Sequence, residues 1–110
     1  TEMPRIYNMA DIFILPSYTE GSPASLIEAM SCGCASICSN VGECKYIIEN
    51  FKSGILIPAG NYIELAEALK LLITNHEIIE KFRINGRKSV IKYSKNYASI
   101  HKFVFNQMIN

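Results

Sequence analysis

The sequence predicts an α/β fold in which a small parallel sheet is covered by helices. Three short apolar runs carry this prediction, at residues 11–15, 35–39 and 55–57. Each is of the kind found in buried parallel strands, and helical patterns separate them. Strand-helix-strand order implies right-handed crossovers and parallel pairing. We therefore expect a partial, three-layer Rossmann-like sheet of about three strands, followed by C-terminal helices.

The first helix has clear start and stop signals. Ser22 before Pro23 makes a favourable N-cap and N1 pair, so a helix is expected to begin at Pro23 and continue over residues 24–30. Gly33 should end it, because glycine tolerates the positive φ of a helix C-terminus. This helix follows the strand at 11–15 through a short loop.

The second half of the sequence changes from strand to helix periodicity. A short helix is expected over residues 43–49, between the second and third strands. Asn61 is expected to cap a helix that Asn75 interrupts, and further helices are expected over 77–93 and 97–108. The predicted apolar faces are Ile63, Ala66, Leu69, Leu72 and Ile73 in the first of these, and Ile78, Ile79, Phe82, Val90 and Ile91 in the second.

Composition limits the class of protein. The 110 residues are 49% hydrophobic and 19% charged, which suits one globular domain or part of one. A net charge of +1 gives no strong field to attract nucleic acid, so no nucleic-acid partner is expected. The C-terminal part is basic, which predicts a solvated helix face or, as an alternative, contact with an anionic membrane surface. These basic residues are Lys81, Arg83, Arg87, Lys88, Lys92, Lys95 and Lys102.

Four cysteines lie within thirteen positions, at Cys32, Cys34, Cys38 and Cys44. Their spacing lacks the paired form that is usual for a zinc site. The cysteines are therefore expected to be small buried hydrophobes in a reducing compartment, with metal or redox chemistry as the alternative.

The loop after the first strand is the candidate ligand site. In open parallel sheets, ligands bind beyond the carboxyl ends of the strands. The helix that follows this loop offers unpaired backbone N–H groups, which attract phosphate, and Gly21 permits close approach of a ligand. These N–H groups belong to Ala24, Ser25 and Leu26.

Two glutamates flank this helix start. Glu20 precedes the helix, and Glu28 lies about one and a half turns into it. An ionised carboxylate only accepts hydrogen bonds, so each glutamate can hold the vicinal hydroxyls of a sugar or a ribose. With a diphosphate on the helix N-terminus, the pattern suits a nucleotide sugar. The alternative is two surface glutamates placed favourably near a helix dipole.

The stretch over residues 10–61 resembles the donor-binding domain of retaining glycosyltransferases of family 4, which have the GT-B fold. The resemblance rests on the strand ending in LPS, on EGSP, on EAMSCG and on the E-x7-E spacing of Glu20 and Glu28. It implies that Glu28 binds ribose hydroxyls and that Glu20 contacts the transferred sugar. It also implies that the backbone of residues 21–24 (Gly21, Ser22, Pro23 and Ala24) faces the sugar, and that the N–H groups of Ser25 and Leu26 meet the diphosphate.

Several positions depart from the family pattern. Ser22 stands where Phe is frequent, Cys34 and Ala35 stand where Leu-Pro is common, and Glu43 replaces the second Gly of a VGG segment. Lys45 stands where Pro is common. None of these touches the two glutamates, so the class is expected to hold while the identity of the donor stays open.

The resemblance also implies what surrounds this chain. Residues 1–110 are expected to be the second half of a C-terminal nucleotide-sugar-binding domain. A basic Arg and Lys pair and an N-terminal acceptor domain are expected upstream. The implied activity is transfer of a sugar from a nucleotide-diphosphate sugar to a glycan or lipid-linked acceptor with retention of configuration, and no cofactor or metal. A cytoplasmic place at the inner face of the membrane, with peripheral membrane contact, is expected.

Two other function classes remain. A non-catalytic nucleotide- or sugar-binding module would use the same helix start. A dinucleotide-dependent oxidoreductase shares the sheet type, but G-x-G-x-x-G does not follow the first strand of this sequence.

Overall fold

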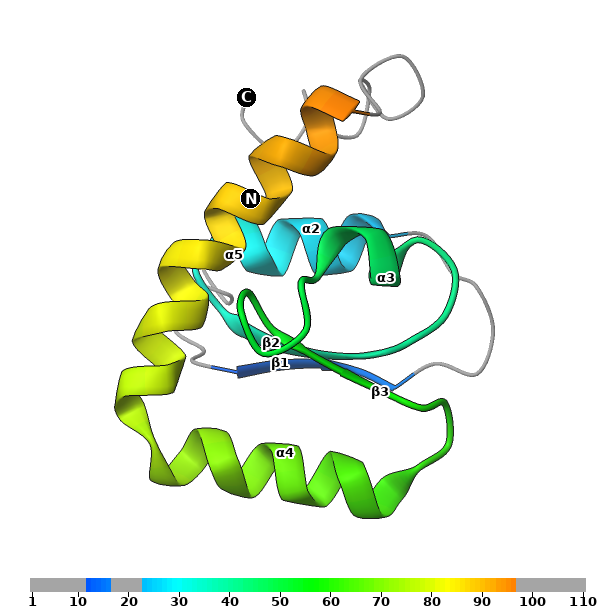
Figure 1. Cartoon of the computed structure of the whole chain (residues 1–110), viewed down its shortest axis with the longest axis vertical. Coiled ribbons are helices and arrows are strands. Elements are labelled where there is room, and N and C mark those ends of the chain that lie inside the picture. The colour runs from blue at the N-terminus through cyan, green and yellow to red at the C-terminus, as the bar shows by residue number, and fades with distance from the viewer. Residues whose placement is uncertain (1–11, 17–22, 97–110) are drawn as a thin grey trace.

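The computed structural model describes residues 12–16 and 23–96. Its elements follow the predicted order (Figure 1). They are β1 (Ile12–Leu15), α2 (Ala24–Ser31), β2 (Ala35–Ser39), α3 (Cys44–Ile47), β3 (Ile55–Ile57), α4 (Tyr62–Thr74) and α5 (His76–Asn96). The strands form one parallel sheet in the order β1-β2-β3, with Ile12 opposite Ala35 and Ile37 opposite Ile55. The predicted α/β fold with a three-stranded parallel sheet is confirmed.

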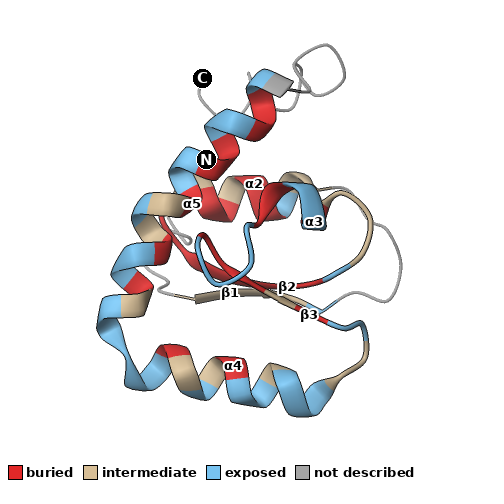
Figure 2. Cartoon of the chain, viewed as in Figure 1, coloured by how far each residue is buried: buried red, intermediate tan, exposed pale blue. Residues whose placement is uncertain are grey.

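The sheet separates two hydrophobic cores, because alternate residues of β2 point to opposite faces. On one face, Cys38 packs with buried residues of α2 and α3. On the other face, Ala35 and Ile37 pack with Ile55, Ile57 and residues of α4. Figure 2 shows buried positions facing the sheet from the helices on both sides, so the three-layer arrangement is built by the alternation within β2.

Helix α5 joins the two cores. Near its start, Ile79 and Phe82 belong to the core beneath α4, whereas Val90 and Tyr93 belong to the core beneath α2 and α3. Between them lies Gly86, where an added Cβ would stand 3.7 Å from the carbonyl oxygen of Ser53. Since Ser53 precedes β3, α5 crosses the amino ends of the strands and leaves their carboxyl ends free of this helix (Figure 1).

The predicted apolar faces of the C-terminal helices were partly wrong. Ile63 and Ile73 of α4 are 75% and 71% exposed, and Ala66 is exposed too. The residues of α4 that face the core are Leu65, Ala68, Leu69 and Leu72. The predicted set advanced in steps of three residues, and each such step rotates by about −60° on a helix, so it spread around the axis. In α5, the predicted core residue Ile91 is 51% exposed.

The bounds of α3 and α5 differ from those predicted. Helix α3 ends at Ile47, before the predicted end at 49, because Ile48 has extended backbone angles (φ −88°, ψ 124°). Helix α5 is longer than predicted, at His76–Asn96. Asn61 caps α4 as predicted, with its side chain accepting a hydrogen bond from the N–H of Glu64 at 3.0 Å. Asp11 and the helix predicted over 97–108 lie outside the described residues.

Candidate functional site

The start of α2 lies at the carboxyl edge of the sheet, because the helix follows β1. Pro23 stands at its N-cap position with φ −74° and ψ 0°, and no side chain caps the helix there. The carbonyl of Pro23 accepts the hydrogen bond from Ile27 N–H at 2.9 Å. Ser22 as N-cap and Pro23 at N1 would start the helix at Pro23, whereas the helix begins one residue later, at Ala24. Ser22 itself lies outside the described residues.

The first turn of α2 presents backbone donors beyond the carboxyl end of β1. The N–H groups of Ser25 and Leu26 precede the first helical hydrogen bond, and Pro23 has no N–H group. Ser25 is exposed, whereas the side chain of Leu26 is fully buried in the core. Leu26 therefore anchors the helix start through its side chain, and only its backbone can meet a ligand.

Glu28 lies in the second turn, beside the first. Helical neighbours are three and four positions apart, so Glu28 shares one face of α2 with Ala24 and Ser25. This face stays out of the core: Ala24 and Glu28 are half-buried and Ser25 is exposed. The carboxylate also acts on Cys32, where burial first and Glu28 second raise the pKa of the thiol. An acceptor carboxylate and the N–H donors of the first turn thus lie on one helix face.

The far end of α2 is fixed by a Schellman motif. Gly33 N–H donates to Met30 O at 3.0 Å, and Cys34 N–H donates to Ala29 O at 3.0 Å. Gly33 has φ +87°, so the predicted glycine stop is confirmed. The Arg87 guanidinium of α5 donates to Ser31 O at 3.3 Å, which places positive charge at the helix C-terminus. These contacts fix the turn that follows α2 and tie the end of the helix to α5.

Two more loops meet at the carboxyl edge, and the sequence did not single them out. Asn40 N–H, after β2, donates to Ile57 O at the end of β3 at 2.7 Å. An open hollow of about 500 Å³ lies after β3 and is lined by Pro58–Ile63. Tyr62 and Ile63 at its rim are 63% and 75% exposed. The sequence analysis had no signal for this hollow, because it placed Ile63 on the buried face of the helix.

Glu43 has a defined role in this structure. Its carboxylate accepts a hydrogen bond from the Tyr93 hydroxyl of α5 at 3.0 Å. The side chain of Tyr93 is buried, so the bond ties the start of α3 to α5 across a partly buried contact. The departure from glycine at this position therefore has a structural partner fifty residues away.

Cys34, Cys38 and Cys44 are buried, as predicted for small hydrophobes, whereas the prediction was wrong for Cys32, which is only partly buried. A hydrogen bond with the Cys44 thiol and burial both raise the pKa of Cys38. Both features hold Cys38 as a neutral thiol. Among residues 12–16 and 23–96, no cluster of three His, Cys, Asp or Glu side chains could hold a metal ion.

The candidate site is described only in part. Glu20, Gly21 and Ser22 lie outside the described residues, whereas Pro23, Ala24, Ser25, Leu26 and Glu28 lie together in the first two turns of α2. Within the described ranges, no helix is long and apolar enough to cross a membrane.

Comparison with known proteins fits this architecture. Residues 1–89 match the family model of glycosyl transferases group 1. The chain belongs to this family. A solved C-terminal domain of a group 1 glycosyl transferase from Francisella tularensis superposes with a TM-score of 0.76 at 30% identity, over 83% of this chain and 47% of that one. A sucrose-phosphate synthase from Thermosynechococcus elongatus superposes with a TM-score of 0.77 at 26% identity, over 94% of this chain and 27% of that one.

Curated members of the group 1 family are also similar in sequence. The N,N'-diacetylbacillosaminyl-diphospho-undecaprenol alpha-1,3-N-acetylgalactosaminyltransferase of Campylobacter jejuni is 30% identical over 87% of this chain and 26% of its own length. The UDP-Gal:alpha-D-GlcNAc-diphosphoundecaprenol alpha-1,3-galactosyltransferase of Escherichia coli is 29% identical over 82% of this chain and 23% of its own length. The chain thus spans about a quarter of these two relatives.

Proposed function

We propose that this chain is the second half of the C-terminal donor-binding domain of a retaining, family 4 glycosyltransferase with the GT-B fold. The whole protein transfers a hexose-type sugar from a nucleotide-diphosphate sugar to a glycan or lipid-linked acceptor. The observation that carries the proposal is the helix start of α2, with its N–H donors at the carboxyl edge of the sheet and Glu28 on the same face. Membership of the group 1 family supports this assignment.

The α2 start suits the leaving group of such a reaction. The diphosphate of the donor accepts hydrogen bonds from the N–H groups of Ser25 and Leu26 and gains from the positive end of the helix dipole. Its negative charge grows as the sugar departs, so fixed donors at this point stabilise the transition state. The basic pair expected upstream would share this role, and the proposal therefore includes no metal or other cofactor.

The two glutamates have separate roles in this proposal. Glu28 accepts hydrogen bonds from the ribose hydroxyls, beside the diphosphate on the same helix face. Glu20 contacts the hydroxyls of the transferred sugar and supports positive charge at its anomeric carbon, so it is the proposed catalytic residue. The backbone of Gly21, Ser22, Pro23 and Ala24 faces the sugar.

The proposed acceptor is lipid-linked. The relatives from Campylobacter jejuni and Escherichia coli are named for acceptors on diphospho-undecaprenol, which is a lipid. We propose the same acceptor class for the present protein. We also place the protein in the cytoplasm, at the inner face of the membrane and in peripheral contact with it. Its proposed product is an intermediate of polysaccharide synthesis.

Substitution of Glu28 in the full-length protein tests the donor site. Glu28→Gln keeps the side-chain shape and removes the charge, and a charge-assisted hydrogen bond contributes about 1.5–3 kcal/mol. We expect calorimetry with a panel of nucleoside diphosphates to show affinity weaker by about tenfold or more. Glu67→Gln, at an exposed position of α4, is the matched control and should leave affinity unchanged.

Glu20→Gln separates catalysis from binding. Transfer from the donor that the wild type accepts should fall far more than nucleotide affinity falls. Unchanged nucleotide affinity in Glu28→Gln would refute the ribose role, and full transfer by Glu20→Gln would refute the catalytic role. Tight donor binding by the wild type without transfer to any acceptor would instead indicate a non-catalytic binding module.

A further inference from the structure

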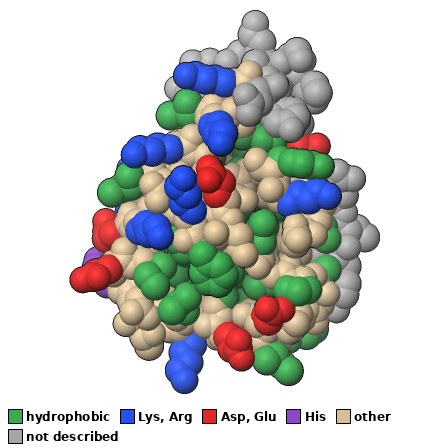
Figure 3. All heavy atoms as spheres, in the orientation of Figure 1, with side chains coloured by type: hydrophobic (Ala, Val, Ile, Leu, Met, Phe, Trp, Pro, Cys, Tyr) green, Lys and Arg blue, Asp and Glu red, His purple; other side chains and the backbone are tan. Residues whose placement is uncertain are grey.

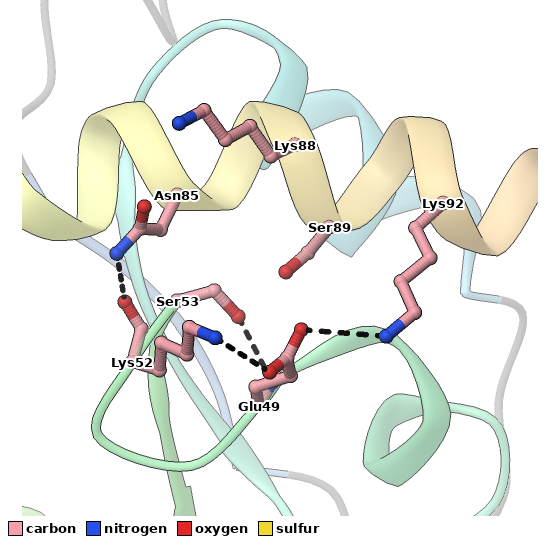
Figure 4. A pocket seen from close by; sticks show the side chains of 7 residues that line it. All are labelled: Glu49, Lys52, Ser53, Asn85, Lys88, Ser89 and Lys92. Atoms are coloured by element: carbon pink, nitrogen blue, oxygen red, sulfur yellow. Dashed lines mark hydrogen bonds and ion pairs between the residues drawn. The ribbon is translucent and has the colours of Figure 1, made fainter.

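A second concave site lies at the opposite edge of the sheet from the α2 start. We call it the lysine pocket, a hollow of about 130 Å³ between α5 and the turn that precedes β3 (Figure 4). Because the strands are parallel, the turn before β3 and the loop after β1 lie at opposite sheet edges. The pocket is therefore separate from the candidate donor site. Its lining residues are Glu49, Lys52, Ser53, Asn85, Lys88, Ser89 and Lys92.

The floor of the pocket is held rigidly. Ser53 is buried, and its hydroxyl accepts the N–H of Glu49 at 2.9 Å. The Asn85 amide of α5 donates to Lys52 O at 2.9 Å, and Lys81 of the same helix donates to Phe51 O at 3.3 Å. Two side chains of α5 thus fasten the turn to the helix, so the shape of the pocket exists before any ligand binds.

The pocket is positive. Three ammonium groups and one carboxylate line it, which gives a net charge of +2. Glu49 is paired with Lys52 at 3.6 Å and with Lys92 at 3.9 Å (Figure 4). Within residues 12–16 and 23–96, Lys88 has no ion-pair partner. The single carboxylate therefore draws two lysines toward one point without neutralising the group.

The ion pairs that are present can give way to a ligand. The side chains of Lys52 and Lys92 are 67% and 71% exposed, and that of Glu49 is 44% exposed. Ion pairs at such exposure contribute little to stability, so an anion can take over the lysines at small cost. Ser89 and Asn85 add a hydroxyl and an amide at the wall, both of which can donate to oxygen.

The positive charge extends along α5 beyond the pocket. Lys81, Lys88, Lys92 and Lys95 are exposed and, at about 100° per residue, lie within about 60° of one another on the helix. Figure 3 shows Lys and Arg side chains gathered on this face of the molecule around one acidic side chain. Such a stripe raises the local concentration of anions in front of the pocket.

We propose that the lysine pocket binds a phosphate group, with Lys52, Lys88 and Lys92 as its cationic ligands. A phosphate monoester or inorganic phosphate carries up to two negative charges near neutral pH, which matches the +2 charge of the lining. A volume of about 130 Å³ holds several water-sized groups, enough for the phosphate oxygens. The phosphate belongs either to a small soluble molecule or to a phospholipid headgroup.

Inorganic phosphate and the full-length protein provide the first test. Amide chemical shifts are followed by NMR during a phosphate titration, because they separate the two edges of the sheet. We expect shifts at residues 49–53 and 85–92. Lys88→Gln together with Lys92→Gln should weaken the affinity for phosphate at least about tenfold. Lys70→Gln on α4, which removes one positive charge outside the pocket, should leave this affinity unchanged. Glu49→Gln should tighten binding, since it removes a repulsive carboxylate.

Vesicles distinguish the two sources of phosphate. Co-sedimentation is compared for vesicles of phosphatidylglycerol and of phosphatidylcholine. Binding to phosphatidylglycerol alone that the double variant loses, without shifts from free phosphate, would assign the pocket to a lipid headgroup. Shifts with free phosphate that the double variant loses would assign it to a soluble ligand. Shifts confined to residues 24–26, or binding that the double variant retains in both assays, would overturn the proposal.

Discussion

Two buried glycines should respond in opposite ways to the same added methyl group. Gly86 lies inside α5, where a Cβ would meet Met30 Cε at 3.6 Å and Ser53 O at 3.7 Å. These are ordinary van der Waals distances. Gly54 lies before β3, where a Cβ would meet the backbone oxygen of Ser36 at 2.9 Å and Ile48 side-chain carbons at 3.2 Å. The first site has room for alanine and the second does not.

The expected magnitudes follow from these distances. Gly86→Ala should raise the free energy of unfolding by about 0.5–1 kcal/mol, because alanine loses less backbone entropy in a helix. Gly54→Ala should lower it by about 1–3 kcal/mol, the usual cost of overpacking, since the oxygen of Ser36 belongs to the central strand. With an m-value of about 1.5 kcal/mol/M, the urea midpoints should move by about +0.5 M and −1.3 M.

Urea unfolding of this chain, followed by circular dichroism, measures both shifts. The two variants differ from the wild type by one methyl group each, so each is the control for the other. A stable Gly54→Ala variant would show that β2 yields without cost at Ser36. A destabilised Gly86→Ala variant would show that α5 lies closer to Met30 than the distances above allow.

Three further outcomes can be measured on the same protein. Gly33→Ala should lose about 1–3 kcal/mol in urea unfolding, because the residue has φ +87° and a Cβ would meet an arginine nitrogen at 2.8 Å; wild-type stability would contradict the motif at the end of α2. Tyr93→Phe should lower the free energy of unfolding by about 1–2 kcal/mol, because it removes the hydrogen bond to Glu43. An unchanged urea midpoint would show that this bond does not stabilise the fold. Cys32 alone among the four thiols should react with Ellman's reagent in the folded state, slowly at pH 7 and faster as pH rises, since burial and then Glu28 raise its pKa; equal reaction of two or more thiols would refute this.

Local rules were enough for several features of this chain. Asn61 and Gly33 act where short-range backbone preferences apply, and both were predicted correctly as helix start and stop. The apolar runs at 35–39 and 55–57 became β2 and β3 with the predicted bounds, because continuous apolar segments of this length are buried in parallel sheets. The donor-site prediction for Glu20 remains a prediction, since that residue lies outside the described structure.

Other features depended on contacts between distant parts of the chain. Ile63 and Ile73 look like core residues by spacing, but the sheet contacts only the face of α4 that carries Ala68 and Leu72. Nothing local in the basic C-terminal sequence predicts a pocket, because its other wall is the turn at 49–53, more than thirty residues earlier.

The sequence by itself determined where β2 and β3 lie, that Gly33 ends α2 and that Asn61 caps α4. Each of these depends on side chains within a few residues of one another, where hydrogen-bonding and steric preferences act directly. Only the tertiary structure decided which helix faces are buried, that α5 crosses the amino ends of the strands, and that its lysines meet Glu49. Those outcomes depend on how rigid elements pack, and no local preference contains that information.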